Sequence, residues 1–215
     1  MRTFVKFCGL SDAATIELVP AGGAAGFVID VPGSPRTVPL ERAARLAEVV
    51  PSDREIWAVT VDPPVELIHR IFEEMGTDRV QVHGRIPEGL DTVVRRHIVP
   101  SLAIPRPGSG DPVPELPGTD LASLVHLDAA GGALPGGGGV LPDWEICARI
   151  ITSAPGRKIV LGGGLDPANV ESALTSVAPW GVDVSSGIES APGIKDPKRM
   201  AAFLDAVRHW EATHA

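Results

Sequence analysis

Polar side chains that can carry protons stand at the ends of several short apolar segments in this chain. Cys8 closes the segment "FVKFC", His83 follows "RVQV" and Asp128 follows "LVHL". A thiol and a carboxyl group that meet at one mouth can serve as a base and an acid, and histidine carries protons near neutral pH. The spacing therefore predicts proton-transfer chemistry, provided that the fold brings these segment ends together.

Two further residues stand in comparable places. Arg36 lies in "GSPRTV" and can hold a carboxylate through two parallel hydrogen bonds, and Asp183 lies in "GVDVSS" as a reacting or a supporting group. Each candidate has a structural alternative. The sequence leaves open a buried inert thiol at Cys8, a turn cap at Asp128, a surface ion pair at Arg36 and a loop hydrogen bond at His83.

Two glycine- and serine-tipped segments predict a phosphate site. They read "IVLGGG" over 159–164 and "VDVSSGIES" over 182–190. A phosphate needs backbone N–H groups at close range, and side chains on the loop would hold it away. Two ordinary tight turns are the alternative. The candidate phosphate-binding residues are Gly163, Gly164, Ser185, Ser186 and Gly187.

Apolar runs alternate with helical stretches along the whole chain. Most of the runs are continuous, as expected for parallel strands that are covered on both faces. Helix starts are indicated by Ser11-Asp12, Asp166-Pro167 and Asp196-Pro197. We expect strands at 3–7, 25–29, 56–61, 79–82, 97–104, 123–127, 158–161 and 182–184, and helices at 11–19, 40–50, 65–75, 143–152, 167–177 and 197–211.

Eight strands with intervening helices predict one (β/α)₈ TIM barrel that spans residues 1–215. In such a barrel the reactive groups stand at the carboxyl ends of the strands, and the loops after the last two strands hold phosphate. Residues 105–119 contain five prolines and three glycines, so an irregular region should replace most of the fifth helix. A domain linker is the competing interpretation of that region. The glycine-rich segment 129–139 is interpreted as a mobile active-site loop.

Composition excludes several classes of protein. Hydrophobic residues make up 44% of the chain and charged residues 21%, with a net charge of −8 and no basic run, so we expect neither a nucleic-acid face nor a membrane span. The N-terminus has no signal-peptide pattern, and the cytoplasm is the expected compartment. Of the two cysteines, Cys147 lies mid-helix as a small buried thiol. We expect a phosphorylated small molecule as partner and a monomer, with a homodimer as the alternative.

Seven segments together resemble phosphoribosylanthranilate isomerase of tryptophan biosynthesis. The resemblance covers nearly the whole chain in order and spacing, and its last block is the most specific. The segments are "VKFCGL" at 5–10, "SPRTV" at 34–38, "QVHG" at 81–84, "LDA" at 127–129, "GGGGVLPDW" at 136–144, "LGGGLDPANV" at 161–170 and "GVDVSSGIESAPGIKD" at 181–196.

The resemblance implies an Amadori rearrangement of N-(5-phosphoribosyl)anthranilate with no cofactor and no metal. Cys8 would be the general base at C2, Asp128 the general acid at the furanose oxygen, and Arg36 the ligand of the anthranilate carboxylate. His83 and Asp183 would complete the substrate-binding set. Burial would keep Asp128 protonated. A Cys8 base needs a lowered pKa or a positive neighbour, for which Lys6 and the iminium of the ligand are the candidates.

The chain departs from the family pattern around the substrate. Gly138, Val140 and Pro142 replace a hydroxyl residue, a lysine and an aromatic residue in the loop after strand six, and strand five lacks its usual lysine. Strand two reads "GFVID" where "GFVF" is more usual. These changes spare the expected acid and base. Two alternatives therefore remain, namely a paralogous isomerase of a related aminoribosyl phosphate and a barrel that binds a sugar phosphate without turnover. The sister isomerase of the histidine pathway is disfavoured, because that family carries an aspartate at the position of Cys8.

Overall fold

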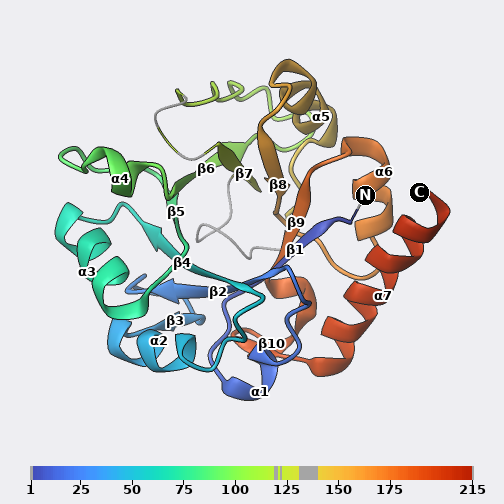
Figure 1. Ribbon diagram of the computed structural model, residues 1–215. Helices are drawn as coiled ribbons and strands as arrows, with labels where there is room; N and C mark the ends of the chain where they lie inside the picture. Colours follow the sequence, from blue (N-terminus) through green and yellow to red (C-terminus); the bar gives the residue numbers. More distant parts are fainter. Residues whose placement is uncertain (1, 119–120, 122, 131–139, 215) are drawn as a thin grey trace.

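Eight parallel strands close into a barrel in the computed structural model, with helices around it (Figure 1). The structure describes residues 2–118, 121, 123–130 and 140–214. The barrel closes because β1 pairs with both β2 and β9. Its strands are β1 Phe4–Cys8, β2 Ala24–Ile29, β4 Glu55–Val61, β5 Arg79–His83, β6 Ile98–Ile104, β7 Leu124–Ala129, β8 Lys158–Leu161 and β9 Gly181–Val184.

Three short strands lie outside this ring. The two-residue β3, Thr37–Val38, pairs in parallel with the end of β2. An antiparallel hairpin of β10, Glu189–Ala191, and β11, Ile194–Lys195, follows β9. The predicted barrel and its eight strands are confirmed, each within two residues of the expected ends.

The helices agree less closely with the prediction than the strands do. The prediction for α3 is correct at both ends, whereas α1 is shorter than expected and is capped by Asp12, whose carboxylate accepts from the Thr15 backbone. The helices are α1 Ala13–Ile16, α2 Leu40–Ala47, α3 Val65–Met75, α4 Thr92–Arg95, α5 Trp144–Ser153, α6 Val170–Val177 and α7 Pro197–Thr213.

Two helix predictions need correction. Asp166-Pro167 does not begin α6, because the Asp166 carboxylate accepts from the backbone of Ala168 and Asn169 and thereby closes a separate turn before the helix. The short α4 was not predicted, since none of its residues is buried and it therefore carries no apolar pattern. Asp196 caps α7 as expected, with Pro197 in its first turn.

The proline-rich region stands where the fifth helix of a regular barrel would be. Residues 105–118 contain no helix, as predicted. The linker interpretation fails because β6 and β7, on either side of this region, pair with each other in one barrel. Thr119, and residues 131–139 of the predicted mobile loop including Gly138, lie outside the described residues.

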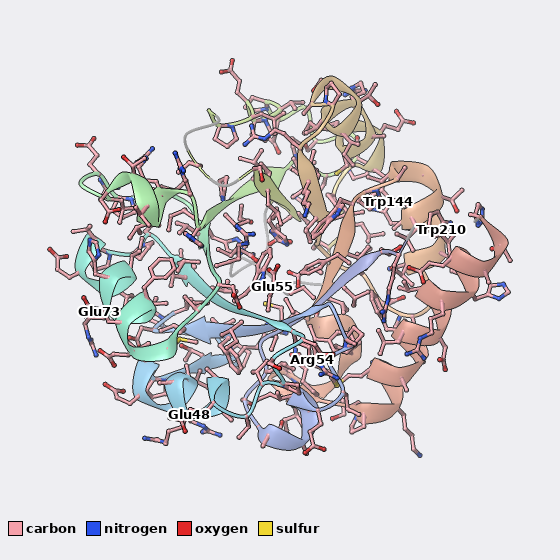
Figure 2. The ribbon with its side chains drawn as sticks, in the orientation of Figure 1. Glu48, Arg54, Glu55, Glu73, Trp144 and Trp210 are labelled. Carbon is pink, nitrogen blue, oxygen red and sulfur yellow. The ribbon has the colours of Figure 1, made fainter. Side chains whose placement is uncertain are left out.

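The barrel interior consists of an apolar floor and a polar layer above it. Alternate side chains of a strand point inward, so residues two apart stack toward the carboxyl end. The floor consists of Phe4, Ala24, Trp57, Val99, Leu124 and Val160. Above it we define the polar layer as Lys6, Gln81, Ser101, His126 and Asp183, which contact one another. Figure 2 shows side chains filling the barrel, whereas Glu48 and Glu73 lie on its outside.

Candidate active site

A cavity opens at the carboxyl ends of the strands, above the polar layer. It has a volume of about 590 Å³ including its open mouth, which suits a small molecule. Nine of the ten residues singled out in the sequence line it, namely Cys8, Arg36, His83, Asp128, Gly163, Gly164, Asp183, Ser185 and Ser186. Gly187 is not among them, and the Cβ of any other residue there would lie only 2.0 Å from the Leu165 carbonyl oxygen.

The loops after β8 and β9 expose backbone to this cavity. Gly163 and Gly164 have φ of +81° and +62°, a conformation that other residues rarely adopt. A Cβ on Gly163 would lie 2.7 Å from the backbone nitrogen of Ala129. Ser185 and Ser186 lead into a single 3₁₀ turn, Ser186–Ile188. Both loops therefore offer close backbone approach to an anion, as the glycine and serine pattern predicts.

Asp128 lies within β7 and is buried at the cavity wall. One of its oxygens accepts from the backbone N–H of Ala129 at 2.9 Å, and the other lies 3.8 Å from Nδ1 of His83. Burial raises the pKa of Asp128, against the opposing effects of the Ala129 hydrogen bond and the Lys6 charge. A carboxyl group with a raised pKa keeps its proton toward neutral pH and can act as an acid.

Cys8 is the last residue of β1 and is buried beside two ammonium groups. Burial raises the pKa of the Cys8 thiol, and the charges of Lys6 and Lys195 oppose that rise. The expected positive neighbour is therefore present, whereas a lowered pKa is not found, because burial outweighs the two charges. Lys6 is fully buried one inward position below Cys8, over the Trp57 ring, with Nζ 5.5 Å from the ring centroid. A Cβ on Gly26 would lie 3.0 Å from Cε of Lys6, so the glycine makes room for this ammonium.

Asp183 links the two sides of the polar layer. It accepts from Nζ of Lys6 at 2.9 Å, and its second oxygen lies 3.1 Å from Nε2 of His126. Burial alone would raise the pKa of Asp183, but Lys6 and His126 hold it below its ordinary value. Asp183 is therefore a buried carboxylate that binds Lys6 and His126 and also lines the cavity.

His83 faces the cavity at the end of β5 and contacts the polar layer through Gln81. Burial, with the charge of Lys6, lowers the pKa of His83 to about 3, so the imidazole is neutral near neutral pH. Its Nε2 lies 2.9 Å from Nε2 of Gln81. Loop bonding is thus not its role here, because its partners are barrel side chains.

Arg36 is at the cavity but is already paired. Its Nε and Nη2 donate to the two carboxylate oxygens of Glu189 at 2.7 and 2.8 Å. Lys195 donates to Glu189 at 2.7 Å and to the carbonyl and hydroxyl oxygens of Ser185 at 3.0 and 3.2 Å. The pair is buried, so a surface ion pair is not the correct interpretation of Arg36.

Residues that sequence reasoning did not single out complete the site. Glu189 and Lys195 come from the β10–β11 hairpin, and Gln81, Ser101 and His126 come from the polar layer. Burial raises the pKa of the other cysteine, Cys147 in α5, to about 12, as fits an inert buried thiol. Within the described residues no cluster of His, Cys, Asp or Glu could hold a metal ion, and no helix is long and apolar enough to cross a membrane.

Comparison with known sequences decides the family. The sequence model of N-(5'phosphoribosyl)anthranilate (PRA) isomerase matches residues 5–206. The chain belongs to the PRA isomerase family. It is 38% identical over 215 residues to the N-(5'-phosphoribosyl)anthranilate isomerase of Chelativorans sp. (strain BNC1), covering 97% of each chain.

Solved structures agree with this assignment. TrpF from Jonesia denitrificans matches with a TM-score of 0.75 and 32% identity, over 97% of this chain and 98% of that one. A PRA isomerase in complex with reduced 1-(o-carboxyphenylamino)-1-deoxyribulose 5-phosphate matches with a TM-score of 0.72 and 27% identity, over 96% and 99% of the two chains. The resemblance seen in the sequence is thus confirmed, and with it the single-domain barrel.

Proposed function

We propose that this protein isomerises N-(5'-phosphoribosyl)anthranilate to 1-(2-carboxyphenylamino)-1-deoxyribulose 5-phosphate in tryptophan biosynthesis. Family membership supports the reaction. The observation that carries the residue roles is the placement of two buried proton carriers on one cavity. Asp128 has a raised pKa, and Cys8 stands next to the Lys6 ammonium.

The first step is proton transfer from the Asp128 carboxyl group to the furanose ring oxygen. The C1–O bond breaks, and the nitrogen lone pair forms a C1=N iminium. The Cys8 thiolate then takes the proton from C2, and the C–H electrons form a C1=C2 bond and neutralise the nitrogen. The resulting enol gives up its hydroxyl proton while C1 gains one, which yields the ketone. Each proton transfer contributes typically 10²–10⁴-fold in rate.

The anionic ends of the substrate are assigned to the two sides of the cavity. The phosphate is held by the backbone N–H groups of Gly163, Gly164, Ser185 and Ser186 and by the Ser186 hydroxyl, because the Ser185 hydroxyl donates to the Cys8 carbonyl. Gly187 supports that loop through its close approach to Leu165. The carboxylate is assigned to Arg36. Because Glu189 occupies Nε and Nη2, the remaining Nη1 edge of the guanidinium meets the carboxylate.

His83 and Asp183 are assigned to the substrate-facing wall between these ends. Both line the cavity, and each is held by a side chain of the polar layer, His83 by Gln81 and Asp183 by Lys6. His83 is neutral, so it neither attracts nor repels the substrate charge strongly. Residue Asp183 serves mainly by keeping the Lys6 ammonium in place beside Cys8.

Turnover of substrate generated in situ tests the proposal through the loss of anthranilate fluorescence. We expect Cys8→Ser and Asp128→Asn to reduce turnover by two or more orders of magnitude. Cys147→Ser is the matched control, because that thiol is buried in α5 and lies away from the cavity lining. A folded wild type without turnover would refute the proposal. Retained phosphate binding would then favour the non-catalytic barrel, and turnover of another aminoribosyl phosphate would favour the paralogue.

We infer a monomer in the cytoplasm. The exposed large apolar side chains of the described residues lie on separate elements, including Val93 on α4, Ile194 on β11 and Val49 after α2, which supports a monomer. Both cysteines are free thiols, as expected in a reducing compartment. Sedimentation velocity at micromolar concentration tests the assembly state, and a dimer would contradict the inference.

A further inference from the structure

Gln81 lies at the centre of the polar layer, between the two histidines of the site. Its side-chain nitrogen is 2.9 Å from Nε2 of His83 and 3.3 Å from Nδ1 of His126. The residue is 1% exposed, and its amide oxygen has no hydrogen-bond partner among the described residues. A buried acceptor without a partner calls for a reason that fixes the amide in this orientation.

The positive charge of Lys6 determines the orientation of the Gln81 amide through Asp183 and His126. Lys6 donates to Asp183 at 2.9 Å, and an ionised carboxylate only accepts hydrogen bonds. His126 must therefore carry its proton on Nε2, which lies 3.1 Å from the second oxygen of Asp183. In the neutral His126 ring, Nδ1 then holds a lone pair, and that lone pair requires donors on its other side.

Two groups face Nδ1 of His126, and both can donate. The Ser101 hydroxyl lies at 2.8 Å and the Gln81 nitrogen at 3.3 Å. If the Gln81 amide were turned over, its oxygen would face this lone pair and be repelled. The chain that starts at Lys6 therefore directs the NH₂ group of Gln81 toward both imidazoles.

The same NH₂ group determines the protonation site of His83. An amide nitrogen only donates, so Nε2 of His83 accepts and the ring proton sits on Nδ1. This is the nitrogen that lies 3.8 Å from a carboxylate oxygen of Asp128. A neutral imidazole has one N–H, and here that N–H faces the acid.

We propose that Gln81 is a positioning residue that fixes His83 as the Nδ1–H tautomer, so that His83 donates to the Asp128 carboxylate formed when the acid releases its proton. The inference rests on the proposed role of Asp128 as the acid. A buried carboxylate without a donor is costly, so this donor favours the transition state in which charge develops on Asp128. The contact at 3.8 Å has to shorten in the substrate complex.

Nitrogen NMR of histidine labelled with ¹⁵N tests the tautomer directly, and kinetics tests its consequence. In the wild type we expect His83 to carry its proton on Nδ1. Gln81→Met keeps a side chain of similar length without the donor, and we expect a mixture of tautomers and a kcat lowered about tenfold, with KM little changed. Gln81→Glu presents only acceptors, and we expect the proton of His83 to move to Nε2.

The pH profile gives a readout that a merely structural role would not change. The ionisable groups around Asp128 are His83, His126, Asp183 and Lys6, and all of them remain in both variants. Losing the His83 donor destabilises the Asp128 carboxylate, so the alkaline limb of kcat should move to higher pH in Gln81→Met.

Ser101→Ala is the matched control, because Ser101 shares Nδ1 of His126 with Gln81 but has no hydrogen bond to His83 among the described residues. We expect it to leave the tautomer of His83 unchanged. A wild-type His83 with its proton on Nε2, or an unchanged tautomer in Gln81→Glu, would overturn the inference. Lost activity in Gln81→Met with an unchanged tautomer would overturn it as well. The NMR measurement of the His83 tautomer does not depend on turnover. If the assignment of Asp128 as the acid is wrong, this shows separately, because the Asp128→Asn variant then remains active.

Discussion

Replacing Lys6 by methionine tests whether the buried ion pair stabilises the barrel. Lys6 is completely enclosed and its partner side chain, Asp183, is 9% exposed, with 2.9 Å between Nζ and Oδ1. Removing one partner of such a pair leaves a buried charge and typically costs about 3–5 kcal/mol. For a chain of this length each kcal/mol corresponds to roughly 2–4 °C, so we expect the melting temperature to fall by about 6–20 °C.

Urea and thermal unfolding of three variants separate this pair from general effects of the substitution. In Lys6→Met combined with Asp183→Asn, the neutral amide can still accept from His126, so at least half of the lost stability should return. Arg70→Met removes an exposed i,i+4 pair with Glu74 and should change the midpoint least. A loss of less than about 1 kcal/mol in Lys6→Met, or a double variant as unstable as the single one, would refute the reasoning.

Three further predictions concern other parts of the site. Because the pKa of His83 is lowered to about 3 from 6.5, the unfolded state binds more protons between these values. The free energy of unfolding should therefore fall as pH drops from 6.5, by up to ~1.4 kcal/mol per pH unit, and urea titrations at pH 7, 6 and 5 should show a shallower fall in His83→Asn. Glu189→Gln removes the charge that holds Arg36, so KM should rise about tenfold with a smaller change in kcat, and an unchanged KM in steady-state assays would contradict this. Gly163→Ala should lower ribose 5-phosphate affinity in calorimetric titration and cost about 1–2 kcal/mol, whereas Gly156→Ala, also at positive φ but with open space around it, should lose stability alone.

The elements that the sequence predicts best are those whose own residues decide their limits. The strand at 158–161 and the helix at 65–75 are continuous or periodic apolar runs bounded by proline or glycine, and both have the predicted ends. The start of α6 was misplaced because Asp166 and Asn169 form a local turn that competes with the helix for the same backbone groups. Such competition depends on geometry that a pattern of residue types does not contain.

The site follows a similar division. Strand ends converge in a barrel, so the positions of Cys8, His83 and Asp128 could be predicted. The layer beneath them was predicted only in part, because the sequence pointed to Lys6 and Asp183 but not to Gln81, Ser101 or His126, although a signal exists. Lys6, Gln81 and His126 each precede one of these residues by two positions, as inward-facing side chains on the same strand must. The pairing of Arg36 with Glu189 had no comparable signal, because 153 residues separate the two.

The ion pair between Lys6 and Asp183 joins β1 to β9, and its partners are 177 positions apart in the sequence. The hydroxyl of Ser185 donates to the Cys8 carbonyl across the same junction, over an equal separation. Bringing such distant strands together is slow, because a long loop must be closed before the contact forms. A nascent chain whose β9 has not yet left the ribosome contains Cys8 and Lys6. It lacks Asp183, the partner of the Lys6 ammonium, and the loop that carries Ser185. Catalysis in this protein therefore begins only when β9 and the loop after it have joined β1, and the appearance of activity during refolding reports the moment at which the ring closes.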